Sequence, residues 1–125
     1  MGERVESGTP TPTVVDLAGL AREEPARRPA WAVQSDDLNA NLLVFEEGGV
    51  VAEHVNNEVD VLIVGIAGAG VITVNGGEQA LRAGQAILVP RGATRATRSA
   101  GGRFAYLTCH RRRRGLMPTG LTERS

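Results

Sequence analysis

Residues 84–99 read GQAILVPRGATRATRS and contain two short β-type segments separated by turn residues. A glycine precedes the apolar run Ala86–Pro90, an Arg-Gly pair makes the next break, and Thr94–Ser99 follows. Short runs bounded by Gly and Pro are typical of β-strands. An apolar run without alternation indicates a strand that is buried on both faces. The stretch therefore predicts two successive strands of an all-β protein.

The same spacing continues on both sides of this stretch. From position 31 onward, β-type segments alternate with turn residues at intervals of about ten residues, which is typical of a β-sandwich or barrel. The predicted strands are Trp31–Gln34, Asn39–Glu46, Val50–Val55, Val59–Ala67, Gly70–Asn75, Glu78–Arg82, Ala86–Pro90, Thr94–Ser99 and Arg103–Arg111. Asn75-Gly76 predicts a tight hairpin, because a type I′ turn needs positive φ at both central residues.

The order of turns and strands from Gly49 to Ser99 resembles the two sequence blocks of the cupin superfamily. The second block matches from Gly84 through Pro90 and Gly92 to Thr94. This resemblance implies a single cupin barrel, a double-stranded β-helix of the jelly-roll type, with a short N-terminal arm.

In the cupin superfamily two His, one Glu and a later His converge inside the barrel on a divalent metal. Here His54 keeps the first of these positions, Asn56 stands at the second and Arg95 at the last. Asp60 has the expected spacing from His54, whereas Glu58 has the expected spacing to a later glycine. We favour Asp60, and a β-bulge would reconcile either choice.

These replacements change the chemistry that the resemblance implies. An Asn amide is a poor ligand for transition metals, and Arg cannot be deprotonated to coordinate one. A guanidinium at this place would repel a dication but would grip a carboxylate or phosphate. The sequence therefore predicts a barrel without metal or cofactor that binds a small polar or anionic molecule. In the alternative, Arg95 points outward or pairs with Asp60.

Candidate site residues follow from these positions and from strand alternation. We assign possible catalytic roles to His54, Asp60 and Arg95. The candidate ligand-binding residues are Asn41, Asn56, Glu58, Tyr106 and His110, since Tyr106 and His110 share one strand face if that face is interior.

Two other functions compete with ligand binding, and whether the chain is an enzyme stays open. The first is a cupin isomerase, cyclase or dioxygenase that uses His54 and an acid, with a divalent transition metal held by His54, Asp60 and His110. For His110 a hydrogen-bonded or solvated residue at the barrel rim is the preferred interpretation. The second is a purely structural barrel, whose interior would be packed with side chains.

The rest of the sequence indicates how the chain is divided into segments and where the protein is expected to reside. We expect an arm at residues 1–30 with a short strand or helix within Val14–Arg22, the barrel at 31–114 and a tail at 115–125. The single cysteine, Cys109, excludes an internal disulfide and is expected to be a small buried residue. The N-terminus lacks the apolar stretch of a secretory signal, so we expect a cytoplasmic protein.

Expected partners follow from the surface pattern. No apolar run is long enough for a membrane span of roughly 20 residues. Nucleic acid is not expected, because the run Arg111–Arg114 has no interleaved aromatic residues. Val59–Ala67 is apolar on both faces, which indicates that one face packs on the N-terminal segment or on a second subunit. We therefore expect a small-molecule ligand and a homodimer.

Overall fold

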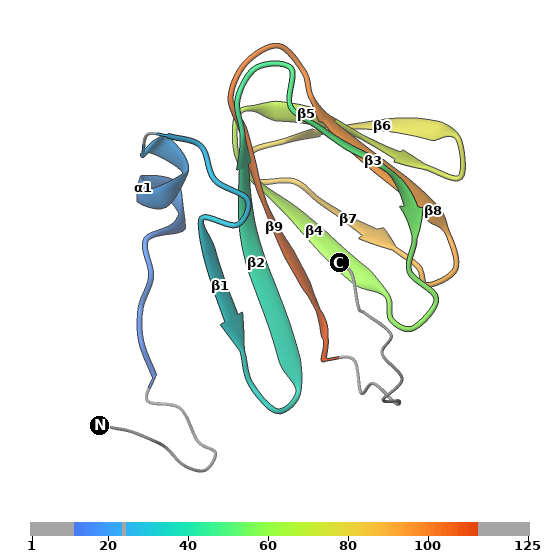
Figure 1. Cartoon of the computed structure of the whole chain (residues 1–125), viewed down its shortest axis with the longest axis horizontal. Coiled ribbons are helices and arrows are strands. Elements are labelled where there is room, and N and C mark those ends of the chain that lie inside the picture. The colour runs from blue at the N-terminus through green and yellow to red at the C-terminus, as the bar shows by residue number, and fades with distance from the viewer. Residues whose placement is uncertain (1–11, 24, 113–125) are drawn as a thin grey trace.

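Nine β-strands and one short helix form the part of the chain that the computed structural model describes, residues 12–23 and 25–112 (Figure 1). The elements are α1 (Leu17–Arg22), β1 (Trp31–Gln34), β2 (Leu38–Phe45), β3 (Val50–Val55), β4 (Val61–Ala67), β5 (Ala69–Val74), β6 (Gly77–Arg82), β7 (Ala86–Val89), β8 (Thr94–Ser99) and β9 (Phe104–Arg111). The predicted all-β fold is confirmed.

The strands form two antiparallel sheets. The five-stranded sheet has the order β1-β2-β9-β4-β7, and the four-stranded sheet has the order β3-β8-β5-β6. Strands that are neighbours in space are often far apart in sequence, as with β2 and β9 or β3 and β8. The sheets face one another across a shared interior (Figure 1).

The hairpin between β5 and β6 forms where Asn75-Gly76 predicts it. Both residues have positive φ, 50° at Asn75 and 85° at Gly76, and Val74 pairs with Gly77 directly across the turn. Asn tolerates this conformation better than most residues and Gly adopts it without steric cost. The turn thus fixes the register of the two strands.

The interior between the sheets is a hydrophobic core. Its aromatic centre is Phe45, Phe104 and Tyr106, with Phe104 and Tyr106 stacked and Phe45 edge-on to both. Aliphatic side chains from both sheets surround the rings, including Ile63 and Ile72, which are fully buried.

A second, smaller cluster lies on the outer face of the five-stranded sheet. Helix α1 begins at its N-cap Asp16, whose side chain accepts a hydrogen bond from Gly19 N at 3.0 Å. The helix buries Ala21 against Leu42, Val44 and Ala105 of the sheet. The N-terminal segment therefore covers part of the outer face, as the apolar pattern of the central strand indicates.

Two predicted elements start later in the structure than the sequence indicates. Residues 12–16 form no strand, and Val14–Arg22 contributes only the helix. The strand predicted at Val59–Ala67 starts at Val61, because the backbone N–H groups of Glu58 and Val59 bond to the Asn56 side chain. The predicted tail, 115–125, lies outside the described residues.

No helix within the described ranges is long and apolar enough to cross a membrane.

Candidate functional site

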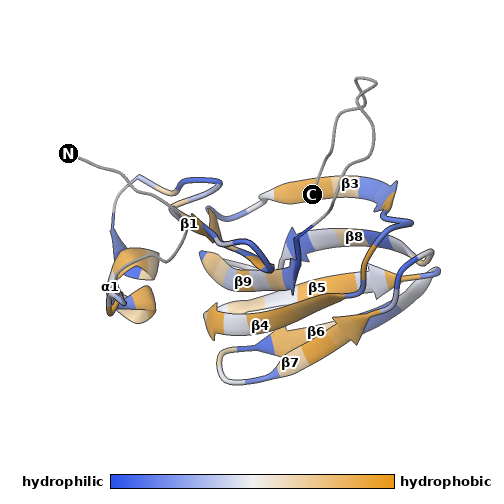
Figure 2. Cartoon of the chain, turned by 90° about the horizontal axis from the view of Figure 1, so that it is seen from below, coloured by the Kyte–Doolittle hydropathy of each residue, from blue (hydrophilic) through white to orange (hydrophobic). Residues whose placement is uncertain are grey.

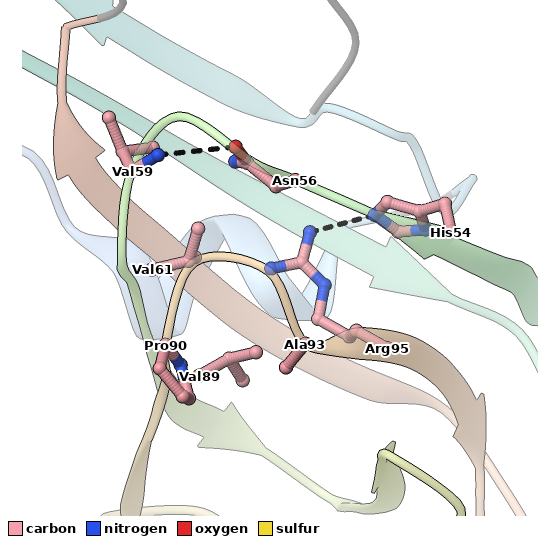
Figure 3. A pocket seen from close by; sticks show the side chains of 8 residues that line it. All are labelled: His54, Asn56, Val59, Val61, Val89, Pro90, Ala93 and Arg95. Carbon is pink, nitrogen blue, oxygen red and sulfur yellow. Dashed lines mark hydrogen bonds between the residues drawn. The ribbon is translucent and has the colours of Figure 1, made fainter.

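Arg95 and His54 face each other across neighbouring strands of the four-stranded sheet. The β3–β8 register pairs His54 with Arg95 directly, after an irregularity between Val51 and His54. Arg95 is a buried cation with 8% of its surface exposed, and its inward direction matches that of Ala93 and Thr97 two residues away. Arg95 Nη2 donates a hydrogen bond to His54 Nε2 at 3.0 Å (Figure 3).

This contact assigns the tautomer of His54. A guanidinium has only N–H donors, so His54 Nε2 must be the acceptor. His54 Nδ1 then carries the proton and donates to the backbone oxygen of Ala52 at 3.1 Å. Both ring nitrogens are therefore engaged, and the ring is held in a fixed orientation at the edge of the interior.

Asn56 completes the polar wall of the site. Its Oδ1 accepts hydrogen bonds from Glu58 N at 2.9 Å and from Val59 N at 3.3 Å. These two donors fix the orientation of the amide, so Nδ2 points away from the turn. Asn56 Nδ2 is buried and has no hydrogen-bond partner. A buried donor left unpaired is costly, so this atom is a ready contact for an acceptor group on a ligand.

A small hollow joins these three side chains to an apolar wall. About 190 Å³ of non-atom space, open solvent included, lies among the lining residues, but none of it is wide enough for a water molecule. The polar residues His54, Asn56 and Arg95 come from β3, the loop after β3, and β8 (Figure 3). The apolar lining is formed by Val59, Val61, Val89, Pro90 and Ala93.

Neither predicted acid lies in this hollow. Asp60 is exposed, and its Oδ1 accepts a hydrogen bond from Arg91 N at 2.9 Å on the outside of the barrel. Glu58 is also exposed and does not line the hollow. The reason is the Asn56 turn, which directs the side chains of Val59 and Val61 inward and those of their neighbours outward. The expectation that Asp60 faces the site is therefore wrong, and so is the alternative with Glu58.

Tyr106 lies deeper than the hollow and does not line it. Its ring belongs to the aromatic core, and its hydroxyl forms a hydrogen bond with Thr97. Burial raises the pKa of Tyr106 above its ordinary value, while the Thr97 bond and the charges of Arg95 and Arg28 act in the opposite direction. Tyr106 is thus a neutral phenol behind Arg95 rather than a direct ligand contact.

His110 and Asn41 also stand apart from the hollow. His110 is buried on the inner face of β9, opposite Asn39 on β2, and its Nδ1 lies 2.9 Å from the backbone oxygen of Arg111. Asn41 pairs with Thr108 further along the same two strands. Within residues 12–23 and 25–112, no three His, Cys, Asp or Glu side chains gather closely enough to hold a metal ion. The alternative triad would need Asp60 to turn inward, and in this structure its side chain is exposed and accepts from Arg91 N.

The residues at the expected metal position do not fit a divalent cation. His54 Nε2, the lone pair that would coordinate, accepts from Arg95. Asn56 Oδ1 is held by two backbone donors and turns its donor atom inward. The guanidinium of Arg95 adds a positive charge where a dication would sit. The donor set favours an acceptor or an anion in this place.

The two-sheet fold and the position of this hollow define a small β-barrel protein with a candidate binding site in its interior. The family model described as the cupin domain matches residues 41–109, which is more than half of the chain. The chain therefore belongs to the cupin family, and the resemblance found in its sequence is confirmed. No curated protein matches the chain.

Solved structures show the same fold. BH2720 from Bacillus halodurans has a TM-score of 0.73 at 19% identity, covering 88% of both chains. TT1209 from Thermus thermophilus has a TM-score of 0.67 at 26% identity, covering 78% of this chain and 95% of the other. KdgF from a Halomonas species has a TM-score of 0.62 at 21% identity, covering 67% of this chain and 77% of the other.

The apolar wall of the hollow is the part of the site that motif spacing does not reveal. Ala93 could have been found from strand alternation, because it lies two residues before Arg95 on the same face. Val59 could have been found from Asn56, since an Asn followed by polar residues often forms a turn with its own side chain. Because of that turn, the Val59 side chain points inward and the acidic side chains of Glu58 and Asp60 point outward.

Proposed function

We propose that the protein binds a small anionic molecule in the hollow between His54, Asn56 and Arg95, without a metal. The observation that carries this proposal is the pairing of a buried guanidinium with a buried, unpartnered amide donor on the same wall. A carboxylate or phosphate oxygen would satisfy Asn56 Nδ2 and would bring negative charge next to Arg95. Charge-assisted hydrogen bonds of this kind are shorter and stronger than neutral ones.

The apolar wall limits which anions fit. Val61 and Val89 belong to the hydrophobic core and are nearly fully buried, and Val59 and Ala93 lie beside them. The part of a ligand opposite its charged group would contact these side chains, so a short aliphatic chain is favoured over a second charged group. In this conformation the hollow holds no space as large as a water molecule, so a ligand would have to displace the side chains that line it.

The fixed imidazole of His54 supports the same proposal. Because His54 Nε2 accepts from Arg95, one edge of the guanidinium is anchored and its direction is set before a ligand arrives. Preorganised donors lose less conformational freedom on binding. In this arrangement His54 is a positioning residue for Arg95.

Ligand titration with amide chemical-shift mapping tests the proposal. The probes are inorganic phosphate, acetate and butyrate at millimolar concentration, with ethylammonium as a cationic control. We expect shifts at residues around the hollow for at least one anion, with butyrate stronger than acetate, and none for ethylammonium. Failure of all three anions to shift these residues would contradict the proposal and favour a purely structural barrel.

A matched pair of arginine variants locates the binding. Arg95→Gln removes the buried charge, whereas Arg98→Gln removes an outward-facing arginine on the same strand, 45% exposed and paired with Glu78. We expect Arg95→Gln to weaken anion binding at least about tenfold, or about 1.4 kcal/mol. Arg98→Gln should bind as the unchanged protein does. Equal loss in both variants would show that the anions bind through general surface charge.

A further inference from the structure

Two connections between strands close the hollow from outside the sheets. Residues 56–60 connect β3 to β4 and contribute Asn56 and Val59 to the lining. Residues 90–93 connect β7 to β8 and contribute Pro90 and Ala93 (Figure 3). We call these segments loop 56–60 and loop 90–93. Because the hollow holds no space as large as a water molecule, a ligand can enter only when part of this lining moves.

The strands are the fixed part of the lining. Val61 and Val89 pair with each other in the β4–β7 ladder and belong to the core. Figure 2 shows β4 and β7 hydrophobic along most of their length, so moving them would expose apolar surface to water. His54 and Arg95 pair in the β3–β8 ladder. Segments that open to admit ligands come from the least stable parts of a fold, so the movement falls on the two loops.

Two hydrogen bonds join the loops to each other. Gly92 N donates to the backbone oxygen of Asn56 at 2.7 Å, and Arg91 N donates to Asp60 Oδ1 at 2.9 Å. The two acceptors lie at opposite ends of loop 56–60, so neither end can leave loop 90–93 without losing a bond. Gly92 has a φ of 87°, which glycine adopts without steric cost. The two loops should therefore open as one unit.

A third hydrogen bond fastens the middle of loop 56–60 to the neighbouring strand. Arg111 Nη2, at the end of β9, donates to the backbone oxygen of Glu58 at 3.3 Å. The bond reaches across from β9 to the segment that precedes β4, its neighbour in the five-stranded sheet. Arg111 and Glu58 are both exposed, so water can replace this bond when it breaks. The net cost of such an exchange is small, as a reversible opening requires.

We propose that loop 56–60 and loop 90–93 form a closure over the hollow, and that Asp60 and Arg111 are the latches that hold it shut. The inference rests on the proposed function, because it describes how an anion reaches Arg95. The Asp60 carboxylate acts from outside the hollow, through the backbone of the opposite loop. Opening breaks the three bonds and withdraws Val59 from the apolar wall, which gives a ligand the space that the closed hollow lacks.

Hydrogen exchange at the Gly92 amide tests the closure without any ligand. Asp60→Ala removes the acceptor of Arg91 N, whereas Asp60→Asn keeps an acceptor oxygen in its place. Neither variant removes the acceptor of Gly92 N, so exchange there reports opening of the joined loops. We expect exchange at Gly92 to be about three- to tenfold faster in Asp60→Ala, as loss of one hydrogen bond implies, and nearly unchanged in Asp60→Asn. An unchanged rate in Asp60→Ala would overturn the proposal.

A matched pair of arginine variants tests the second latch. Arg111→Ala removes the bond to loop 56–60, whereas the neighbouring Arg112 bonds through Nη1 to the backbone oxygen of Ser35 at 3.4 Å. Arg111→Ala should speed exchange at Gly92 by a factor similar to that of Asp60→Ala, and Arg112→Ala should not. The amide of Ile72, in the core on β5, is the internal reference. Equal acceleration at Gly92 and Ile72 would show destabilisation of the whole fold and would overturn the proposal.

Thiol labelling tests whether this opening gives access to the hollow. Val89 lines the hollow and is 3% exposed, and Cys109 is the only cysteine of the chain. Val89→Cys in a Cys109→Ser background therefore carries a single thiol on the wall of the hollow. A small anionic methanethiosulfonate should label it faster with Asp60→Ala than with Asp60→Asn, by the factor found for exchange at Gly92. Equal labelling rates in the two backgrounds would overturn the closure.

The closure and the proposed function fail in different ways. If Asp60→Ala speeds both exchange and labelling while phosphate, acetate and butyrate shift no residue around the hollow, the closure stands and anion binding is wrong. If the anions bind while Asp60→Ala alters neither exchange at Gly92 nor labelling, the proposed function stands and the closure is wrong.

Discussion

Arg95 and His54 stand directly opposite each other on β8 and β3, and a 3.0 Å hydrogen bond joins the guanidinium to the imidazole Nε2. In this cupin fold a cation thus occupies the side-chain position at which the family resemblance places a histidine ligand. The side chains at the positions that the resemblance assigns to a metal shell therefore include His54, Asn56 and Arg95. Two kinds of variant test whether these side chains favour an anion over a metal. One removes Arg95, and the other restores imidazoles at the positions of Asn56 and Arg95.

Restoring two histidines should create a metal site. Asn56→His and Arg95→His together place three imidazoles, with His54, around the hollow. Neutral imidazoles are good ligands for Ni²⁺ and Co²⁺. We expect the double variant to bind Ni²⁺ at least about 100-fold more tightly than the unchanged protein, a difference of about 2.8 kcal/mol. Calorimetry on untagged protein measures this, and stoichiometric Ni²⁺ binding by the unchanged protein through His54 would contradict our interpretation.

The turns around this site could be predicted from the sequence, whereas the directions of its side chains could be predicted only in part. Gly84, Pro90 and Gly92 are local signals, because each restricts the chain at its own position. These turns form in the structure. Whether Arg95 points inward or outward stayed open in the sequence, and the structure buries its side chain.

The acids could not be placed from the sequence, because their direction depends on a side chain two to four residues earlier. Asn56 Oδ1 takes up the N–H groups of two following residues and delays the start of β4. Side chains alternate with a period of two along a strand, so this one turn exchanges inward and outward positions. Asp60 therefore points outward although its spacing from His54 fits the family pattern.

The titration of Tyr106 should report on the charge of Arg95. Burial raises the pKa of the phenol, so the folded protein keeps this proton at a pH at which the unfolded chain has lost it. The stabilising effect is present below about pH 10, the ordinary value for tyrosine, and is lost as the pH rises through the pKa of the folded state. Tyr106 is the only tyrosine in the chain, so phenolate absorbance follows it alone.

Replacing Arg95 should move this titration upward. The positive charge of Arg95 favours the phenolate, so Arg95→Gln is expected to raise the pKa of Tyr106 further. Arg98→Gln, on the outer side of the strand, is the control and should leave the midpoint unchanged. Circular dichroism at each pH confirms that the fold persists. A midpoint below the ordinary tyrosine value, or one lowered by Arg95→Gln, would contradict the placement of the two residues.

A pair of glycine substitutions tests the packing of the core. A Cβ at Gly70 would lie 2.2 Å from the nearest ring atom of Phe104, whereas at Gly77 the nearest atom is 3.6 Å away. Phe104 is fully buried and cannot move aside without displacing the stacked Tyr106. We expect Gly70→Ala to lower the free energy of unfolding by about 1–3 kcal/mol or more.

Gly77→Ala serves as the control for the same chemical change. Its φ lies outside the left-handed region, so alanine fits, and the free energy of unfolding should change by less than about 1 kcal/mol. Urea unfolding followed by the fluorescence of Trp31, the single tryptophan, measures both variants. Equal stability of the two variants would show that the sheets approach less closely at Gly70 than the structure places them.

Arg103 should hold the N-terminal helix against the sheet. Its guanidinium donates to the backbone oxygens of Ala21 at 3.2 Å and Glu23 at 2.8 Å, and to the Glu46 carboxylate at 3.2 Å. The first two oxygens lie at the C-terminal end of α1, where a helix leaves carbonyl groups without internal partners. The Arg103 side chain is only 20% exposed, so these bonds are shielded more than a surface pair.

Replacing this arginine separates the role of the helix from that of surface charge. We expect Arg103→Ala to lower the free energy of unfolding by about 1–3 kcal/mol, because it leaves the end of α1 without its donors. Arg98→Ala breaks the exposed pair with Glu78, at 45% and 63% exposure, and should cost less than about 1 kcal/mol. The same urea titrations measure both, and Trp31, which packs beside the helix, should report the local change first. If Arg103→Ala were no more costly than Arg98→Ala, packing of Ala21 alone would suffice to hold the helix.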